Sequence, residues 1–182
     1  MNTFKSIIYE LIETLVLSAV VIYLIYAFVA SVEVVSGSSM EPNFHTGERI
    51  LIDKISPYYQ PFKRGEIVVL TPPEEDGKHF IKRIIGIPGD IIKINDCKVY
   101  ISNGTDRFRL VEPYLSQDLC TGGGIAIKEG RSLRIGEGEY LVLGDNRAAS
   151  VDSRFFGFVP KKDIIGRVIF RFWPLDKLGF IK

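Results

Sequence analysis

The stretch Val34-Val35-Ser36-Gly37-Ser38-Ser39-Met40-Glu41-Pro42-Asn43 divides this chain of 182 residues into two parts of different character. Before it lies the one apolar run of membrane length, and after it lies a longer, more polar part. A serine in this stretch would lie where a chain leaving a bilayer first meets water. We therefore expect one of its serines to be a nucleophile.

The apolar run covers residues 14–32 (TLVLSAVVIYLIYAFVASV) and contains no charged side chain. As a helix it would span roughly 28 Å, close to the hydrocarbon thickness of a bilayer. The alternatives are a cleaved signal peptide, whose apolar region runs about 7–15 residues behind a stronger basic segment, and a buried core helix. We predict a single membrane anchor at 14–32, a short cytoplasmic N-terminus at 1–13 and an extracytoplasmic β domain at 33–182. For the orientation, Lys5 supplies only a weak positive-inside signal.

The composition excludes several classes of protein. The 23 basic and 22 acidic residues nearly cancel, so the chain lacks the electrostatic footprint of a nucleic-acid-binding protein. The cysteines are Cys97 and Cys120 and the histidines His45 and His79, too few for a structural zinc site with its usual four or so closely spaced ligands. A metal site built from carboxylates alone has no motif behind it. We expect no metal and no other cofactor.

Short β-type segments bounded by turn signals follow the serine-rich stretch. We predict strands at 49–53, 66–70, 78–87, 91–94, 98–101, 132–135, 140–143 and 164–172. Residues 56–64 are predicted to be a loop, and the poorly patterned residues 102–130 to be an irregular insertion. The absence of βαβ alternation indicates a mainly β fold, an antiparallel barrel-like or sandwich domain.

A serine nucleophile needs a general base, and both histidines and an unprotonated lysine are candidates. Side chains alternate along a strand, so Phe80, Lys82 and Ile84 share one face of the predicted strand 78–87. Large apolar neighbours would desolvate Lys82 and lower its pKa. His79 would then face away from Lys82. The competing interpretation is that Lys82 belongs to a solvated charge pair at a strand edge.

The segment 144–154 (GDNRAASVDSR) is a dense polar cluster between apolar strands. It is either a β-turn with surface ion pairs of little energetic weight or a hydrogen-bonded platform that orients a catalytic side chain. Neither G-x-S-x-G nor S-x-x-K occurs in the chain, which excludes the α/β-hydrolase and penicillin-binding classes.

Several segments together resemble those of the type I signal peptidases (leader peptidases). They occur in that family's order: SGSSMEP at 36–42, RGEIVV at 64–69, FIKRIIGIPGD at 80–90, and GDNR, SVDSR and GFVP within 144–160. The resemblance implies the fold of that family, a barrel-like antiparallel β domain behind one transmembrane helix. Two departures are Asn43-Phe44, where the family commonly has Thr-Leu, and Ala148-Ala149, where it commonly has Asp-Asn.

The resemblance also implies site residues. The serine directly before Met and three before Pro is the family's nucleophile, which selects Ser39 over the other two. The matching lysine, Lys82, is the general base. The serine matching Ser150 hydrogen-bonds that lysine, and the residues matching Asp152 and Arg154 brace the site.

Two further roles follow for residues of these segments. Asp145 is expected to support the site, because it belongs to the last of the matching segments, the one that begins with GDNR. Gly37 stands where some relatives have a serine that helps to hold the oxyanion. We therefore expect backbone N–H groups, chiefly that of Ser39, to take this part.

By this resemblance the chain is a membrane-bound serine endopeptidase that removes signal peptides from exported preproteins after small residues, the A-x-A-like pattern. Its expected partners are those preproteins and the lipid bilayer, and it is expected to be monomeric. Its expected place is the plasma membrane, with a thylakoid or other organelle membrane as the alternative. The rival hypotheses are a related Ser-Lys peptidase that matures one specialised substrate and a non-catalytic, membrane-tethered peptide-binding domain.

The two cysteines allow two interpretations. In an extracytoplasmic compartment Cys97 and Cys120 could form a disulfide that closes a loop over the irregular insertion. Alternatively, both remain unpaired thiols.

Overall fold

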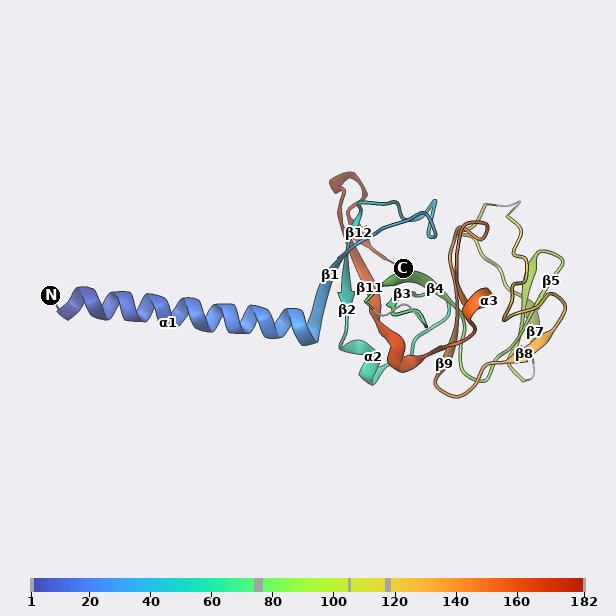
Figure 1. The fold of residues 1–182 in the computed structure, drawn as a ribbon, viewed down its shortest axis with the longest axis horizontal. Coiled ribbons are helices and arrows are strands. Elements are labelled where there is room, and N and C mark those ends of the chain that lie inside the picture. The colour runs from blue at the N-terminus through green and yellow to red at the C-terminus, as the bar shows by residue number, and fades with distance from the viewer. Residues whose placement is uncertain (1, 74–76, 105, 117–118, 182) are drawn as a thin grey trace.

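The computed structural model describes residues 2–73, 77–104, 106–116 and 119–181. A long N-terminal helix projects away from a β domain (Figure 1). The helix α1 runs from Asn2 to Leu24 and continues as a π-helical turn, η1, from Ile25 to Val29. By length and composition, Lys5–Val29 is a candidate membrane span, with a mean hydropathy of 2.2 and no residue buried against the β domain.

The C-terminal end of the apolar run differs from the sequence expectation. The helix ends at Val29, and Ala30–Val34 forms a strand, β1, instead of completing an anchor that reaches residue 32. The reason is tertiary pairing, because β1 forms an antiparallel ladder with Arg49–Asp53, β2. A short run of apolar and β-branched residues fits either structure, so hydrophobicity alone does not locate this boundary.

The larger sheet is antiparallel and curls into an open, half-barrel shape (Figure 1). Its strands are paired in the order β1-β2-β11-β3-β4-β9-β10, with β12 added on β11. The bounds of those not yet given are β3 Ile67–Leu70, β4 Phe80–Gly86, β9 Glu139–Leu143, β10 Val159–Pro160, β11 Ile164–Trp173 and β12 Gly179–Phe180. The predicted mainly β, antiparallel fold is confirmed.

A smaller sheet lies at the end of the molecule opposite α1 (Figure 1). Its order is β7-β6-β5-β8, with bounds β5 Ile91–Asn95, β6 Lys98–Ser102, β7 Arg107–Arg109 and β8 Ser132–Arg134. Strands β5 and β6 form the predicted hairpin, and Asp96 and Cys97 both have positive φ, as a two-residue hairpin turn requires. The predicted insertion thus contains one strand, β7, while its residues 105, 117 and 118 lie outside the described residues.

The segments between strands contain a few short helical turns. Ser56–Tyr59 forms α2 inside the segment predicted to be a loop, and Ser153–Phe156 forms α3, which begins at the C-terminal end of the polar cluster 144–154. Two 3-10 turns, η2 (Lys161–Asp163) and η3 (Leu175–Lys177), flank β11.

Apolar side chains form three buried clusters. Both faces of β3 are covered, because Ile67 and Val69 belong to one cluster and Val68 and Leu70 to another. The third cluster joins β5 and β6 to β9 and includes Ile127 of the insertion. The sheet that carries the site is therefore held on both faces, which makes it a rigid support.

Candidate active site

Ser39 lies in a tight turn that follows β1. The amide of Glu41 donates to the carbonyl of Ser38 at 3.1 Å, and the amide of Phe44 donates to that of Met40 at 2.9 Å. Met40 and Phe44 are buried in the core and hold the turn down. Ser39 itself remains partly exposed, so its hydroxyl is accessible at a fixed position.

Lys82 reaches this hydroxyl from the middle of β4. Its side-chain Nζ donates a hydrogen bond of 2.9 Å to Ser39 Oγ, although the two residues are far apart in the sequence. Only 3% of Lys82 is exposed, and its Nζ lies 4.9 Å from the centre of the Phe80 ring. The interpretation as a solvated charge pair is therefore wrong for Lys82. His79 instead contacts Glu33, at 2.9 Å.

The environment of Lys82 lowers its pKa. Burial removes water from the ammonium and lowers the pKa of Lys82 to about 8. The nearby charge of Arg154 also lowers this pKa, whereas Asp152 and Asp145 raise it. A neutral lysine is thus available near neutral pH, as a general base requires.

The polar cluster 144–154 docks against the turn of Ser39. The amide of Asn146 donates to the carbonyl of Ser39 at 2.9 Å, and its side chain donates to the carbonyl of Ser38 at 3.1 Å. Asp145 accepts two hydrogen bonds from Arg83, of 2.8 and 2.6 Å, and one of 2.9 Å from Asn43. The cluster is a buried platform and not a surface turn, since Asp145 is completely buried.

Asp152 and Arg154 hold the cluster together from inside. Asp152 accepts hydrogen bonds of 2.8 and 2.9 Å from the Arg154 guanidinium and one of 3.0 Å from the amide of Gly144. Arg154 also donates to the carbonyls of Arg147 and Ser150, at 2.7 and 3.2 Å. The pair therefore connects both ends of the cluster.

Ser150 is buried near Ser39 but does not make the hydrogen bond to Lys82 that the resemblance implied. Among the described residues its Oγ has no hydrogen-bond partner. Its position is nevertheless close, because a Cβ added to Gly144 would overlap both Ser150 Oγ and the carbonyl oxygen of Ser39. The absence of a side chain at Gly144 therefore allows the cluster to lie this close to Ser39.

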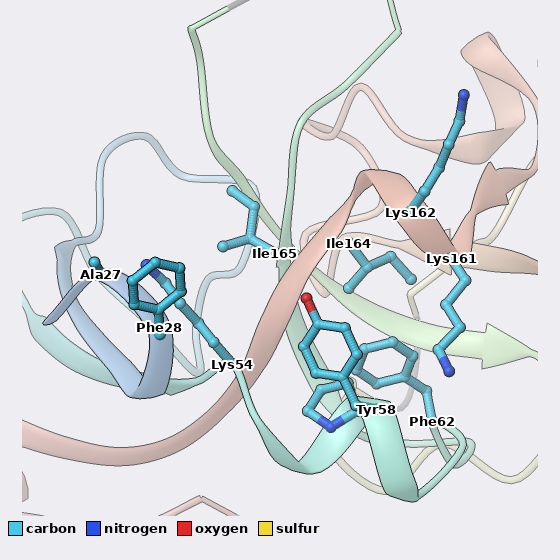
Figure 2. Close-up of a pocket in the computed structure, with 10 residues that line it drawn as sticks. Ala27, Phe28, Lys54, Tyr58, Phe62, Lys161, Lys162, Ile164 and Ile165 are labelled. Carbon is cyan, nitrogen blue, oxygen red and sulfur yellow. The ribbon is translucent and has the colours of Figure 1, made fainter. Parts of the chain in front are cut away.

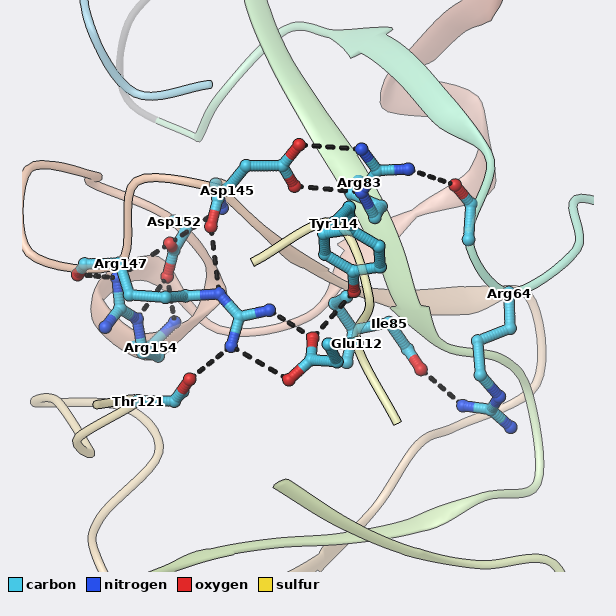
Figure 3. A network of polar contacts seen from close by, with 12 residues as sticks. Arg64, Arg83, Ile85, Glu112, Tyr114, Thr121, Asp145, Arg147, Asp152 and Arg154 are labelled. Atoms are coloured by element: carbon cyan, nitrogen blue, oxygen red, sulfur yellow. Dashed lines mark hydrogen bonds and ion pairs between the residues drawn. The ribbon is translucent and has the colours of Figure 1, made fainter. Parts of the chain in front are cut away.

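A second set of polar residues, absent from the sequence prediction, extends this platform into the insertion (Figure 3). The side chain of Arg147 is fully buried, donates to the carbonyl of Gly144 at 3.0 Å and forms an ion pair with Glu112 and a hydrogen bond with Thr121. Tyr114 donates to Glu112 at 2.6 Å, and the guanidinium of Arg83 lies 3.9 Å from the Tyr114 ring centre.

Burial, with the adjacent carboxylate of Glu112, raises the pKa of Tyr114, so Tyr114 stays neutral and donates. The sequence signal for Arg147 was its place in the GDNR segment. Glu112 and Thr121 lie in the least patterned part of the chain and had no such signal.

Comparison with known proteins shows the family of this chain. The family model described as signal peptidase, peptidase S26, matches residues 8–173. The chain belongs to this family. It is 35% identical over 178 residues to signal peptidase I of Bacillus licheniformis, covering 96% of this chain and 93% of the relative. It is 37% identical over 177 residues to a probable signal peptidase I-2 of Synechocystis, covering 94% and 76%.

Among solved structures, a signal peptidase I from Enterococcus faecalis V583 is 32% identical, with a TM-score of 0.48, and the match covers 59% of this chain and 97% of that one. Family membership makes this chain a serine peptidase of the signal-peptide-cleaving class. Within the described residues, His, Cys, Asp and Glu side chains do not gather in groups that could hold a metal ion.

Proposed function

We propose that this peptidase uses Ser39 as its nucleophile and Lys82 as its general base. The observation that carries the proposal is the hydrogen bond of 2.9 Å between Lys82 Nζ and Ser39 Oγ. The lowered pKa of Lys82, about 8, supports the same assignment, because a serine hydroxyl needs a neutral base beside it.

In the proposed reaction, neutral Lys82 takes the proton of the Ser39 hydroxyl while Ser39 Oγ attacks the scissile carbonyl. The backbone N–H of Ser39 stabilises the resulting oxyanion, since Gly37 offers no hydroxyl for this task. The Lys82 ammonium then protonates the leaving amine. In the second half, Lys82 takes a proton from the water that hydrolyses the acyl ester.

The platform residues are proposed to position these groups. Asp145 fixes Arg83, the neighbour of Lys82 on β4, and Asp152 with Arg154 holds the cluster against the Ser39 turn. Ser150 lies beside the dyad, where its hydroxyl can turn towards Lys82 once a substrate is bound. These side chains act through Ser39 and Lys82 and not on the substrate directly.

We propose that the substrate binds as an added strand at the edge formed by β1. This strand ends the order of the larger sheet, and it leads directly into the turn of Ser39. An extended signal-peptide end placed there would gain main-chain hydrogen bonds, and shallow pockets would select small side chains before the cleaved bond.

The domain arrangement supports a site at a membrane surface. We propose that the chain crosses the plasma membrane, or a thylakoid or similar membrane, once, with residues 1–13 cytoplasmic and the β domain extracytoplasmic. The disulfide between Cys97 and Cys120 supports this side, because disulfides persist in oxidising compartments. The anchor would hold Ser39 near the level at which a signal peptide leaves the bilayer.

A processing assay on a preprotein tests the proposal with three variants. Ser39→Ala and Lys82→Ala are expected to abolish cleavage, whereas His79→Ala is expected to cleave like the unchanged enzyme because His79 contacts Glu33 instead of Ser39. Full cleavage by Lys82→Ala, or a loss of cleavage in His79→Ala alone, would contradict the Ser-Lys mechanism. A panel of preproteins with varied residues before the cleaved bond then tests the preference for small side chains.

A further inference from the structure

A cavity of about 510 Å³ lies where the helical segment meets the β domain (Figure 2). Ala27 and Phe28, near the end of the helical segment, line one side. Residues of η2, of β11 and of the segment following β2 line the rest. Neither Ser39 nor Lys82 lines it, so the proposed proteolysis does not use it. Its volume is in the range of small-ligand sites, roughly 300–1,000 Å³.

The charged residues that line this cavity are all basic. Lys54, Lys161 and Lys162 contribute to its wall, which contains no carboxylate. Among the described residues, the hydrogen-bond acceptor of the Lys54 ammonium is the carbonyl of Tyr26, at 3.4 Å. Within the part of the chain that the structure describes, none of these lysines has an acidic partner. The cavity therefore carries positive charge that a negatively charged ligand would neutralise.

The rest of the wall is apolar and aromatic. Phe62 and Ile164 are buried and form part of the wall, and the largely exposed Tyr58 lies between Lys54 and Lys161 (Figure 2). A small inorganic anion would not need such a surface. Cationic groups beside an apolar wall suit an amphiphile that has an anionic head and a hydrocarbon body.

The position along the chain identifies the source of such a molecule. The candidate span ends at Val29, so Ala27 and Phe28 lie at the level where the chain leaves the hydrocarbon. Tyrosine and lysine side chains are typical of this level, where headgroups lie. The cavity is therefore placed to meet phospholipids of the membrane that the anchor crosses.

We propose that this cavity binds the headgroup of an anionic phospholipid. The ammonium groups of Lys54 and Lys161 attract the negative headgroup from either side of Tyr58, while Phe28 and Tyr58 pack against the glycerol and the upper part of an acyl chain. A lipid bound in this way bridges the anchor and the β domain and fixes the tilt of the domain on the bilayer. The inference uses the proposed membrane span but not the chemistry of Ser39.

Lipid retention by the full chain tests the inference. The protein is placed in nanodiscs of phosphatidylcholine with a minor fraction of phosphatidylglycerol and partly delipidated with detergent, and the retained lipids are quantified by mass spectrometry. The unchanged protein is expected to enrich phosphatidylglycerol. The double variant Lys54→Ala/Lys161→Ala is expected to enrich phosphatidylglycerol about 30-fold less than the unchanged protein, because each lysine near an anionic lipid contributes about 1 kcal/mol independently of the other.

Three control variants distinguish binding at this cavity from a general effect of the protein's positive charge, and from the peptidase activity. Lys54→Arg/Lys161→Arg should retain the enrichment because the charge is kept. Lys128→Ala should also retain it, because Lys128 is exposed and adjoins Ile127, which packs with the smaller sheet at the far end of the molecule (Figure 1). Ser39→Ala should enrich the lipid while failing to cleave, so that the two proposals stand or fall separately.

Three results would each overturn the inference. One is equal enrichment in the double alanine variant, and another is an equal loss in Lys128→Ala, which would indicate a general effect of charge. The third is release of the retained lipid by inorganic phosphate at matched ionic strength, which would assign the cavity to a free anion.

Discussion

At the scale of single residues, the environment of Lys82 decides whether Lys82 can act as the proposed general base. A lysine in water is almost fully protonated at neutral pH and cannot accept a proton from serine. Burial within β4 lowers the pKa of Lys82 to about 8, although Asp152 and Asp145 oppose the shift. About one molecule in ten then carries neutral Lys82 at pH 7, which is sufficient for a general base.

The pH dependence of cleavage follows from this pKa. Lys82 is protonated below its pKa and neutral above it, so kcat/KM on a peptide substrate is expected to rise through about pH 8 and to level off above it. A pH–rate profile of the unchanged enzyme between pH 6 and about 10 measures the midpoint. A rate that is flat or falling across pH 8 would contradict the role of Lys82.

Gly144 provides a second test at this scale. In Gly144→Ala the new Cβ would overlap Ser150 Oγ and the carbonyl of Ser39, so the cluster must move away from the nucleophile. We expect kcat to fall by about 10²-fold, as small misplacements of catalytic groups cost this much. Gly122→Ala is the matched control, because a Cβ there meets no atom within 4 Å. Equal kcat in both variants would contradict the close approach.

At the scale of elements, the site forms where three segments that are distant in the sequence pack together. The turn after β1 supplies Ser39, β4 supplies Lys82, and the cluster 144–154 is held against both by Asp145 and by Asn146. The insertion 102–130 packs against one of them, because its Glu112 pairs with the buried Arg147 of the cluster. The insertion 102–130, which the sequence predicted to be irregular, therefore helps to hold the cluster in place.

Glu112→Gln tests this support. The change keeps the shape of the side chain but leaves the buried Arg147 without its counter-charge, and such a loss typically costs about 3–5 kcal/mol of unfolding free energy. Urea unfolding measures this loss, and we also expect kcat to fall more than KM changes. Glu137→Gln, at an exposed carboxylate, is the control. Unchanged stability in Glu112→Gln would show that the ion pair does not hold the cluster.

At the scale of the whole molecule, the two sheets and the long N-terminal helix have different roles. The larger sheet carries Lys82 and leads into the turn of Ser39, and the smaller sheet includes β7 of the insertion that supports the cluster. The candidate span covers most of α1 and all of η1. The disulfide Cys97–Cys120 connects the β5–β6 hairpin turn to the insertion, one residue before Thr121, which bonds Arg147. The smaller sheet and the site are thus mechanically connected.

Removal of the disulfide is expected to loosen this connection. The double variant Cys97→Ser/Cys120→Ser should lose about 3 kcal/mol of unfolding free energy, because the open chain gains conformational freedom when it unfolds. Chemical denaturation of both proteins without reductant measures the difference. If a reducing agent leaves the midpoint of the unchanged protein where it was, the disulfide does not contribute to stability.

The amino-acid sequence alone predicted the mainly β class and most strands of both sheets, because apolar β-type runs between turn signals are a local property. The strands β1, β7, β10 and β12 were not predicted. The resemblance of its segments to those of the signal peptidases selected Ser39, and the same resemblance, together with the apolar face of the predicted strand 78–87, selected Lys82. The sequence did not reveal β1, since the same apolar residues could continue a helix. The tertiary ladder with β2 ends the helix at Val29.

Only the tertiary structure decided which polar residues meet. Arg83 and Asp145, and likewise Glu112 and Arg147, lie on segments far apart in the sequence, and their burial supplies the reason to pair. From sequence alone, a charged side chain is predicted to lie at the surface, because charged side chains are usually exposed. Folding places these side chains where water is excluded, and an unpaired charge there would be too costly to keep.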